Sequence, residues 1–183
     1  MKLQGKTVAI LAEDEYEDLE LWVPLFRLRE EGAKVLVVGP SLGRFTSKHG
    51  YPVEADAPAS QVDTEELDAV VIPGGYSPDR MRRHPAMVDL VRRVGEEGKT
   101  VAAICHGGWM LASAGLLQDR TVTGFFSIAD DLRNAGAEYV DREVVEDENL
   151  ITSRSPEDLP AFCRALVEAL DESRVQPPVR QRR

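Results

Sequence analysis

The strongest constraint on the fold of this chain is the alternation of short apolar runs with amphipathic segments of helical length. The amphipathic segments include residues 17–31 and 85–97, which end at Gly32 and Gly98, as helices often do. Strands that alternate with helices predict right-handed crossovers and a mostly parallel sheet. The apolar runs are rich in Val, Ile and Leu and lie at residues 7–11, 34–38, 69–72 and 100–104.

Several local patterns refine this prediction. The run at residues 69–72 has no polar alternation, which is typical of a strand covered on both faces. Segments around Phe45 and residues 51–55 predict a small hairpin. Pro24 lies inside the first predicted helix, so we expect a kink or a late start there. Ser155 and Pro156 are suited to the first positions of a last helix.

The length and charge of the chain limit its organisation and partners. A chain of 183 residues suits one domain, which we place at residues 1–172. Residues 173–183 are rich in arginine and surround two prolines, so we predict a disordered basic tail. The net charge of -10 argues against binding to nucleic acid. Apolar runs too short for a bilayer or a secretory signal predict a cytoplasmic protein without membrane contact.

A cysteine at the end of one predicted strand is the main candidate for chemistry. Cys105 follows the apolar run at residues 101–104 and precedes His106-Gly107-Gly108, which predicts a tight turn into a helix. The N–H groups at a helix N-terminus favour an anion, and the thiolate is the nucleophilic form of cysteine. The pattern therefore predicts an activated thiol with a pKa below the usual value of about 8.5. Cys163 falls on the apolar stripe of the last helix, and we expect it to pack in the core.

The histidines leave more than one interpretation open. His106 is adjacent to Cys105 and would act as a general base, as a hydrogen-bond partner of the thiolate, or only as a helix cap. His49 and His84 are interpreted as solvated loop residues. None of the three has the spacing of metal ligands, and the Gly-x-Gly-x-x-Gly pattern is absent. We therefore expect neither a metal nor another cofactor.

Two further loops are expected beside Cys105, because ligands bind beyond the carboxyl ends of parallel strands. Glu17 belongs to the acidic loop after the first strand, and it either complements the helix end or points at the thiol. A protonated Glu17 would donate a hydrogen bond to a thiolate, whereas an ionised one would repel it. Gly75 ends Pro73-Gly74-Gly75, which forms either a simple tight turn or, with the N–H of His106, an oxyanion site.

These residues together resemble the PfpI-like (intracellular protease I) group of the ThiJ/PfpI superfamily, which is similar to class I glutamine amidotransferases. The resemblance extends from Val8 to about Leu170. It implies an α/β fold of flavodoxin-like type, a three-layer sandwich whose mostly parallel central sheet has helices on both faces, with a small β-hairpin. The matching segments are residues 15–21, Lys48-His49-Gly50, Pro73-Gly74-Gly75, residues 103–107, residues 130–136 and Thr152-Ser153-Arg154.

The resemblance also implies roles for individual residues. Cys105 would be the catalytic nucleophile, with Glu17 as its partner carboxylate and His106 beside it. The backbone of Gly75 and His106 would form the oxyanion site. Relatives of this kind form homodimers or hexamers, and in some the neighbouring subunit supplies an acidic residue to the histidine. Asp79 matches that position and is one methylene shorter than the usual Glu, so a triad would be looser here or absent.

Three departures from the family pattern weaken the inference of peptidase activity. Gly108 stands where a proline is common, Phe125 replaces a tyrosine of the peptidase-like members, and Phe126 replaces a common proline. The loss of the tyrosine removes a hydroxyl group near the site. The thiol itself is unaffected by these changes.

Three hypotheses for the function follow. The first is a stress-response enzyme in which Cys105 attacks small reactive carbonyls or glycated groups, as in deglycases and glyoxalases, or peptides, as in cysteine hydrolases. The second is a redox sensor or protective protein without enzymatic activity that works through oxidation of Cys105. The third is a small-molecule binding domain with a vestigial site. All three are compatible with self-association as a homodimer or a larger assembly.

Overall fold

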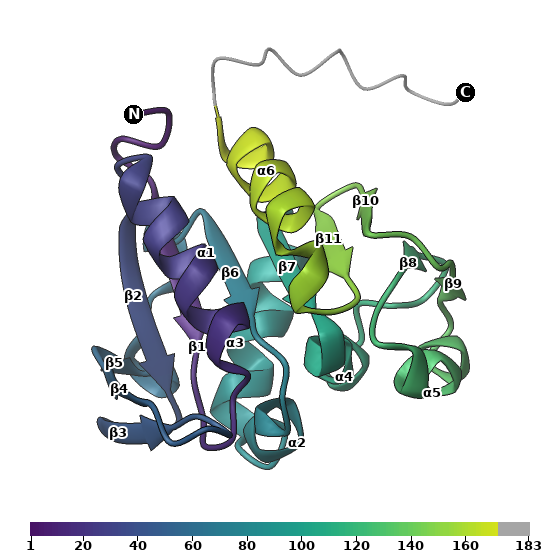
Figure 1. The fold of residues 1–183 in the computed structure, drawn as a ribbon, viewed down its shortest axis with the longest axis horizontal. Coiled ribbons are helices and arrows are strands. Elements are labelled where there is room, and N and C mark those ends of the chain that lie inside the picture. The colour runs from purple at the N-terminus through teal and green to yellow at the C-terminus, as the bar shows by residue number, and fades with distance from the viewer. Residues whose placement is uncertain (172–183) are drawn as a thin grey trace.

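The computed structural model describes residues 1–171, and the predicted tail at residues 173–183 lies outside the described residues. The described chain forms one seven-stranded sheet and two small two-stranded sheets, β3-β4 and β8-β9, with helices packed around them (Figure 1). The strands are β1 (Thr7–Leu11), β2 (Lys34–Gly39), β3 (Gly43–Thr46), β4 (Pro52–Ala55), β5 (Ala57–Pro58), β6 (Ala69–Ile72), β7 (Thr100–Ile104), β8 (Thr121–Val122), β9 (Glu138–Tyr139), β10 (Val144–Asp147) and β11 (Leu150–Ser153). The helices are α1 (Asp18–Glu30), α2 (Ser77–Met81), α3 (Pro85–Glu96), α4 (Gly108–Ser113), α5 (Ala129–Asn134) and α6 (Leu159–Leu170).

The large sheet has the strand order β10-β11-β7-β6-β1-β2-β5. Its neighbours pair in parallel, except that β10 and β11 form an antiparallel pair. The strands at its centre are buried along nearly their whole length, as the apolar runs in the sequence predict. The predicted hairpin is also present, as the antiparallel pair β3-β4.

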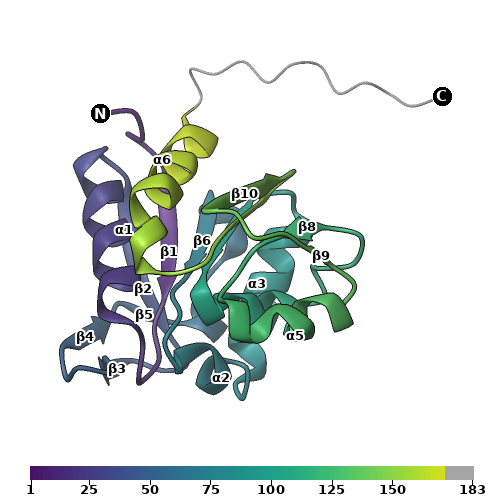
Figure 2. The same cartoon turned by 45° about the vertical axis from the view of Figure 1, so that its right-hand side comes forward.

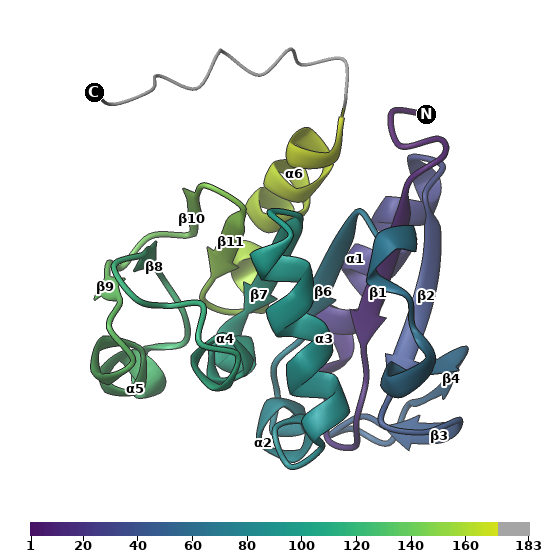
Figure 3. The ribbon, with the colours of Figure 1, turned by 180° about the vertical axis from the view of Figure 1, so that it is seen from behind.

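Helices cover both faces of the sheet and so bury both sides of its central strands. Helices α1 and α6 lie together on one face, whereas α3 and α4 lie on the other (Figures 1 and 3). Each face has its own apolar core, one built on α1 and α6 and the other on α3, α4 and α5. The predicted three-layer α/β sandwich is therefore confirmed. Among residues 1–171, no helix is long and apolar enough to cross a membrane.

Helix α1 differs from the sequence prediction in one respect. It begins at Asp18, so Pro24 does not delay its start, and the helix continues past the proline to Glu30. Pro24 is buried in the core, where its ring packs while its nitrogen has no hydrogen to donate within the helix. The predicted end of this helix is confirmed, since Gly32 follows it with a φ of +93°.

The strands β1, β6 and β7 run parallel, so their carboxyl ends meet at one edge of the sheet. The hairpin β3-β4 and helix α2 lie at this same end of the molecule (Figures 1 and 2). Loops that are far apart in the sequence thus surround one small region. This edge is where the sequence analysis places the functional site.

Candidate active site

Cys105 lies in the tight turn between β7 and α4 and adopts a rare backbone conformation. Its φ is +61°, in the left-handed region that residues with side chains seldom occupy. The N–H of Phe125 donates a hydrogen bond to the Cys105 carbonyl oxygen at 3.2 Å and holds the turn from a second loop. A Cβ atom on Gly107 would lie 2.6 Å from the carbonyl oxygen of Ile72, so only glycine fits there. The turn thereby holds the thiol at the sheet edge, where Cys105 is 7% exposed.

The Gly74-Gly75 turn after β6 lies against the cysteine. A Cβ atom on Gly74 would approach the Cys105 Cβ to 2.8 Å and the His106 nitrogen to 3.0 Å, so the close approach requires glycine. Gly75 has a φ of +74°, which also favours glycine. The backbone N–H groups of Gly75 and His106 both lie near enough to the Cys105 sulfur to act against the rise of its pKa. The structure thus brings together the two N–H groups that the sequence analysis assigned to an oxyanion site.

The carboxyl group beside the thiol belongs to Glu20, on the first turn of α1. Its Oε2 accepts a hydrogen bond from the Gly74 N–H at 2.7 Å, and the carboxyl group faces Cys105. Its Oε1 receives no hydrogen bond from a described N–H or O–H group, which leaves this oxygen to carry a proton toward the sulfur. Burial, and secondly the charge of Glu17, raises the pKa of Glu20 to about 8. Glu20 is therefore mostly protonated at neutral pH.

The prediction that Glu17 points at the thiol is corrected by this geometry. Glu17 is the N-cap of α1, and its Oε2 accepts a hydrogen bond from the Glu20 N–H at 2.9 Å. A capping side chain folds back onto the first turn of its own helix, so it does not extend into the site. Glu20, three residues later, faces inward.

His106 contacts the thiol directly. Its Nδ1 lies 3.2 Å from the Cys105 Sγ, and its ring stacks on Phe125 with 5.0 Å between the ring centroids. Trp109 packs edge-on against the same ring at 4.9 Å. The Oγ of Ser127 lies 3.4 Å from Nε2, on the far side of the imidazole. Burial, with a smaller effect of the Lys48 charge, lowers the pKa of His106, so the neutral imidazole is favoured.

The thiol does not have the lowered pKa that the sequence analysis expected. Burial, and secondly the negative charge of Glu20, raises the pKa of Cys105 to about 12, although the N–H groups of His106 and Gly75 act in the opposite direction. Helix α4 has only six residues and begins three residues after the cysteine, so its dipole contributes little. The resting thiol is therefore protonated. Its activation requires a base, and the neutral Nδ1 of His106 is in contact with it.

The remaining predicted residues lie as follows. Asp79 is on α2, and its carboxylate forms an ion pair with Arg83, two residues after the end of this helix. Cys163 is buried in α6, which confirms the prediction of core packing, and burial raises its pKa to about 11. His84 is not simply solvated, because its Nε2 lies 3.0 Å from a carboxylate oxygen of Glu13.

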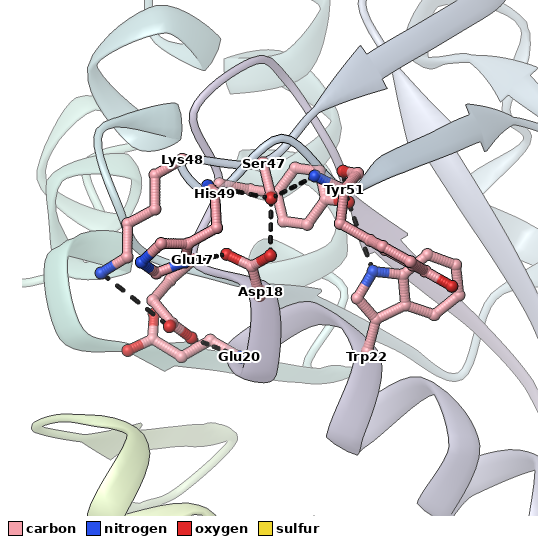
Figure 4. Close-up of polar contacts among 9 residues, drawn as sticks. Glu17, Asp18, Glu20, Trp22, Ser47, Lys48, His49 and Tyr51 are labelled. Atoms are coloured by element: carbon pink, nitrogen blue, oxygen red, sulfur yellow. Dashed lines mark hydrogen bonds and ion pairs between the residues drawn. The ribbon is translucent and has the colours of Figure 1, made fainter.

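A second polar cluster borders the site, on the turn between β3 and β4. We call Asp18, Ser47 and His49 the rim network (Figure 4). The Ser47 hydroxyl donates to one oxygen of Asp18 at 2.6 Å, and the Nδ1 of His49 lies 2.7 Å from the other. The N–H of Tyr51 also donates to the Ser47 Oγ at 2.9 Å. These bonds tie the turn to the start of α1, so His49 has a structural partner that its sequence context did not indicate.

This cluster includes a set of potential metal ligands that the sequence analysis did not expect. Ligand atoms of Glu17, Asp18 and His49 lie within 4.8 Å of one another. The existing bond between Asp18 and His49 would have to break for both to bind an ion. The Lys48 ammonium, 3.9 Å from a Glu17 carboxylate oxygen, also opposes a cation there. The site as it stands is suited to hydrogen bonds.

Comparison with known proteins identifies the family of the chain. The model of the DJ-1/PfpI family matches residues 6–169. The chain belongs to the DJ-1/PfpI family. It is 47% identical over 163 residues to the deglycase TK1284 of Thermococcus kodakarensis, which covers 89% of this chain and 98% of the relative. It is 39% identical over 169 residues to the protein/nucleic acid deglycase 2 of Escherichia coli, over 91% of this chain and 98% of that protein.

A solved structure extends the similarity to three dimensions. A two-domain protein of Anabaena variabilis, with DJ-1/ThiJ/PfpI-like and ferritin-like domains, superposes with a TM-score of 0.90 at 41% identity. The match covers 95% of this chain and 52% of that longer one. The predicted family is thus confirmed. The sequence analysis did not identify roles for Glu20, Ser127 or Lys48, because their contacts in the site depend on tertiary packing between segments far apart in the sequence.

Proposed function

We propose that this protein is a cysteine-dependent deglycase of the cytoplasm, which acts on small reactive carbonyls or glycated groups as part of a stress response. One observation carries the proposal: the Cys105 Sγ lies 3.2 Å from the His106 Nδ1 and is also reached by two backbone N–H groups. A nucleophile, a base and donors for a developing oxyanion are thus in one place. The names of the deglycase relatives support the class of substrate.

The first step in this proposal is addition of the thiol to the carbonyl group. His106 Nδ1 accepts the thiol proton while the sulfur forms a bond to the carbonyl carbon. The electron pair of the carbonyl bond moves to its oxygen, which the N–H groups of Gly75 and His106 stabilise. The proton then passes from Nδ1 to that oxygen and completes a hemithioacetal. Because Glu20 is protonated at neutral pH, it places no negative charge beside the sulfur.

For a 2-oxoaldehyde, the second step is an internal rearrangement followed by hydrolysis. His106 removes the proton from the carbon that carries sulfur, and a proton is added to the neighbouring carbon, which gives the thioester of a 2-hydroxy acid. Water then attacks the acyl carbon, the carbon–sulfur bond breaks, and the thiol regains its proton. One aldehyde and one water yield one hydroxy acid, so no oxidant or cofactor is needed.

Turnover of methylglyoxal by the full chain tests this proposal. Cys105→Ser is expected to abolish formation of lactate, measured by proton NMR, because the hydroxyl group is a far weaker nucleophile in this site. Cys163→Ser is the matched control and should retain wild-type turnover, because Cys163 packs in the core. Equal turnover in the wild type and the Cys105→Ser variant would contradict the proposal.

A specific observation also favours oxidation of Cys105, either reversibly or to the sulfinic acid, as a second function. The two N–H groups and the protonated Glu20 that surround the sulfur would donate hydrogen bonds to sulfinate oxygens. Peroxide should then add one or two oxygen atoms at Cys105 and none at Cys163, as peptide mass spectrometry would show. An unmodified Cys105 at a peroxide concentration that oxidises a free thiol would count against this function.

Self-association as a homodimer or larger assembly is part of the proposal. Apolar side chains on the outer face of α1 support it, with Leu19 51% and Phe26 59% exposed. Asp79 would then come from a neighbouring subunit to His106, after release from its pair with Arg83. Multi-angle light scattering gives the assembly size, and Asp79→Asn should lower turnover at equal assembly size. A monomeric mass at working concentration would contradict the assembly.

A further inference from the structure

Backbone contacts through Tyr16 join the turn that carries Lys48 to the Gly75 loop. The backbone of Tyr16 forms an antiparallel bridge with Gly75 on one side and a parallel bridge with Ser47 on the other. The N–H of Lys48 donates to the Tyr16 carbonyl oxygen at 3.0 Å. Tyr16 is therefore the only residue between the Lys48 backbone and the backbone of Gly75 along this path of contacts.

The rim network fixes the turn that carries this lysine. Asp18 accepts a hydrogen bond from Ser47 on one side of Lys48 and bonds His49 on the other. The flanking residues are thus both tied to the start of α1. Figure 4 shows the Lys48 side chain extending from this turn toward the Glu17 carboxylate.

The Lys48 ammonium keeps its hydrogen-bond donors for a ligand. Its nearest ionic partner is Glu17 at 3.9 Å, which is longer than a hydrogen bond, and no hydrogen bond within residues 1–171 ends on its Nζ. The Lys48 side chain is 45% exposed, whereas the Glu17 side chain is 8% exposed. A molecule that enters from solvent therefore meets the ammonium before it meets the carboxylate.

The negative charge of Glu17 raises the pKa of Glu20, whereas Lys48 is the cation that acts on the reacting groups. Its positive charge lowers the pKa of His106, after burial, and opposes the raised pKa of Glu20. At neutral pH, the Cys105 thiol and Glu20 are both protonated and His106 is uncharged. An anionic group beside the reacting carbonyl would thus meet a cation and no opposing charge on these three residues.

We propose that Lys48 is an anion-binding residue and that the preferred substrates are small carbonyl compounds that carry a carboxylate, of which glyoxylate is the simplest. The proposal names the substrate class of the site described above and so rests on the proposed function. The ammonium would bind the carboxylate while the Cys105 thiol adds across the neighbouring carbonyl group. In this addition the sulfur bonds to carbon and the thiol proton ends on the carbonyl oxygen, so no further reagent takes part.

The decisive experiment compares two alkylating reagents of similar size on the full chain. Iodoacetate is an anion and iodoacetamide is neutral, and both modify the same thiolate. The ratio of their rates at Cys105, measured by peptide mass spectrometry at one pH, therefore cancels any change in the thiol pKa. The variants are Lys48→Met, which removes the charge, and Lys48→Arg, which keeps it. Lys34→Met is the matched control, since Lys34 is the first residue of β2 and lies at the end of this strand away from the site.

The iodoacetate-to-iodoacetamide ratio should fall about threefold to tenfold in Lys48→Met, the range for loss of one unit charge at a partly exposed site. Lys48→Arg and Lys34→Met should keep the wild-type ratio, and 0.5 M NaCl should reduce the ratio of the wild type toward that of Lys48→Met. The neutral reagent reports whether the site is intact in each variant. A wild-type ratio in Lys48→Met, or an equal loss in Lys34→Met, would overturn the proposal.

A second measurement separates this proposal from the proposed enzymatic activity. Glyoxylate should protect Cys105 from iodoacetamide, and the concentration for half protection should rise several-fold in Lys48→Met. Neutral glyoxal should protect both proteins equally. Protection and the alkylation ratio need no turnover, so both can succeed in a protein that proves inactive as a deglycase. Conversely, turnover of methylglyoxal with no selectivity for anions would support the proposed enzymatic activity and contradict the anion-binding role of Lys48.

Discussion

Replacement of Glu20 by glutamine should make the protein more stable at neutral pH, by an amount that grows with pH. The Glu20 carboxyl is fully buried, and burial raises its pKa from 4.5 to about 8. Below pH 4.5 the carboxyl is protonated in both the folded and the unfolded chain. Between pH 4.5 and 8 the folded chain keeps a proton that the unfolded chain releases, so stability falls as pH rises. Glutamine is neutral in both states and removes this loss.

The size of the effect follows from the pKa shift. Each unit of pH between the two pKa values costs about 1.4 kcal/mol, which gives a loss of about 3 kcal/mol between pH 4.5 and 7. The assay is urea unfolding of the wild type and Glu20→Gln at several pH values from 4.5 to 8. The stability of Glu20→Gln relative to the wild type should increase steadily over this range. A comparison of two proteins at each pH cancels the titration of the other groups.

Glu30→Gln is the matched control, because it makes the same chemical change on an exposed position of α1 away from the site. Its stability relative to the wild type should vary by no more than about 0.5 kcal/mol with pH. If the difference between Glu20→Gln and the wild type is also independent of pH, Glu20 is ionised in the folded protein. The account of a protonated carboxyl beside Cys105 would then be refuted.

Four further predictions concern the groups around the thiol. Ser127→Ala removes the contact with the His106 Nε2 and should lower kcat about twofold to tenfold, the effect of one hydrogen bond, whereas Ser41→Ala should have no effect. Ser127→Asp should raise the pKa of His106 and move the acid limb of the kcat profile to higher pH; an unmoved limb would show that Ser127 does not act on the imidazole. Gly74→Ala forces a Cβ to within 2.8 Å of Cys105 and should destabilise the fold by about 2 kcal/mol and end turnover. In urea unfolding, the control Gly98→Ala should cost only about 1 kcal/mol of left-handed backbone strain, because its Cβ meets no atom within 4 Å. Comparable losses of stability in the two variants would mean that the backbone around Cys105 shifts to accommodate the methyl group. The rate of iodoacetamide labelling at Cys105 should keep rising above pH 8.5, because burial raises the thiol pKa to about 12, and a midpoint below 8.5 would show that the N–H groups of Gly75 and His106 outweigh burial.

The fold was predictable from the sequence because its signals are local and repeated. The apolar runs at residues 69–72 and 100–104 are strands of the sheet, and the segments beside His49 form the hairpin. The position of Cys105 was predictable for the same reason, since a strand, a small-residue turn and a helix follow in order. The approach of Gly75 to Cys105 follows from topology, because parallel neighbouring strands end together.

The contacts that control the thiol were not predictable in the same way. Glu17 and Glu20 are three residues apart, and the sequence does not show which caps the helix and which faces the core. Ser127 reaches His106 from a loop that follows another strand, so its contact depends on tertiary packing. The thiol pKa is set by burial and the Glu20 charge, which raise it, against two N–H groups, which lower it. A motif reveals the N–H groups but not the depth of burial.

The two bridges made by Tyr16 have a consequence for the length of molecule that this site accepts. Because a single residue joins the Gly75 loop to the turn of Lys48, the two loops cannot separate without breaking the contacts of Tyr16 on at least one side. The span from the sulfur to the ammonium group then varies only with the rotamers of the lysine chain. The site would therefore discriminate among acids by the number of carbon atoms between carboxylate and carbonyl, and each added methylene would change the rate of reaction at Cys105.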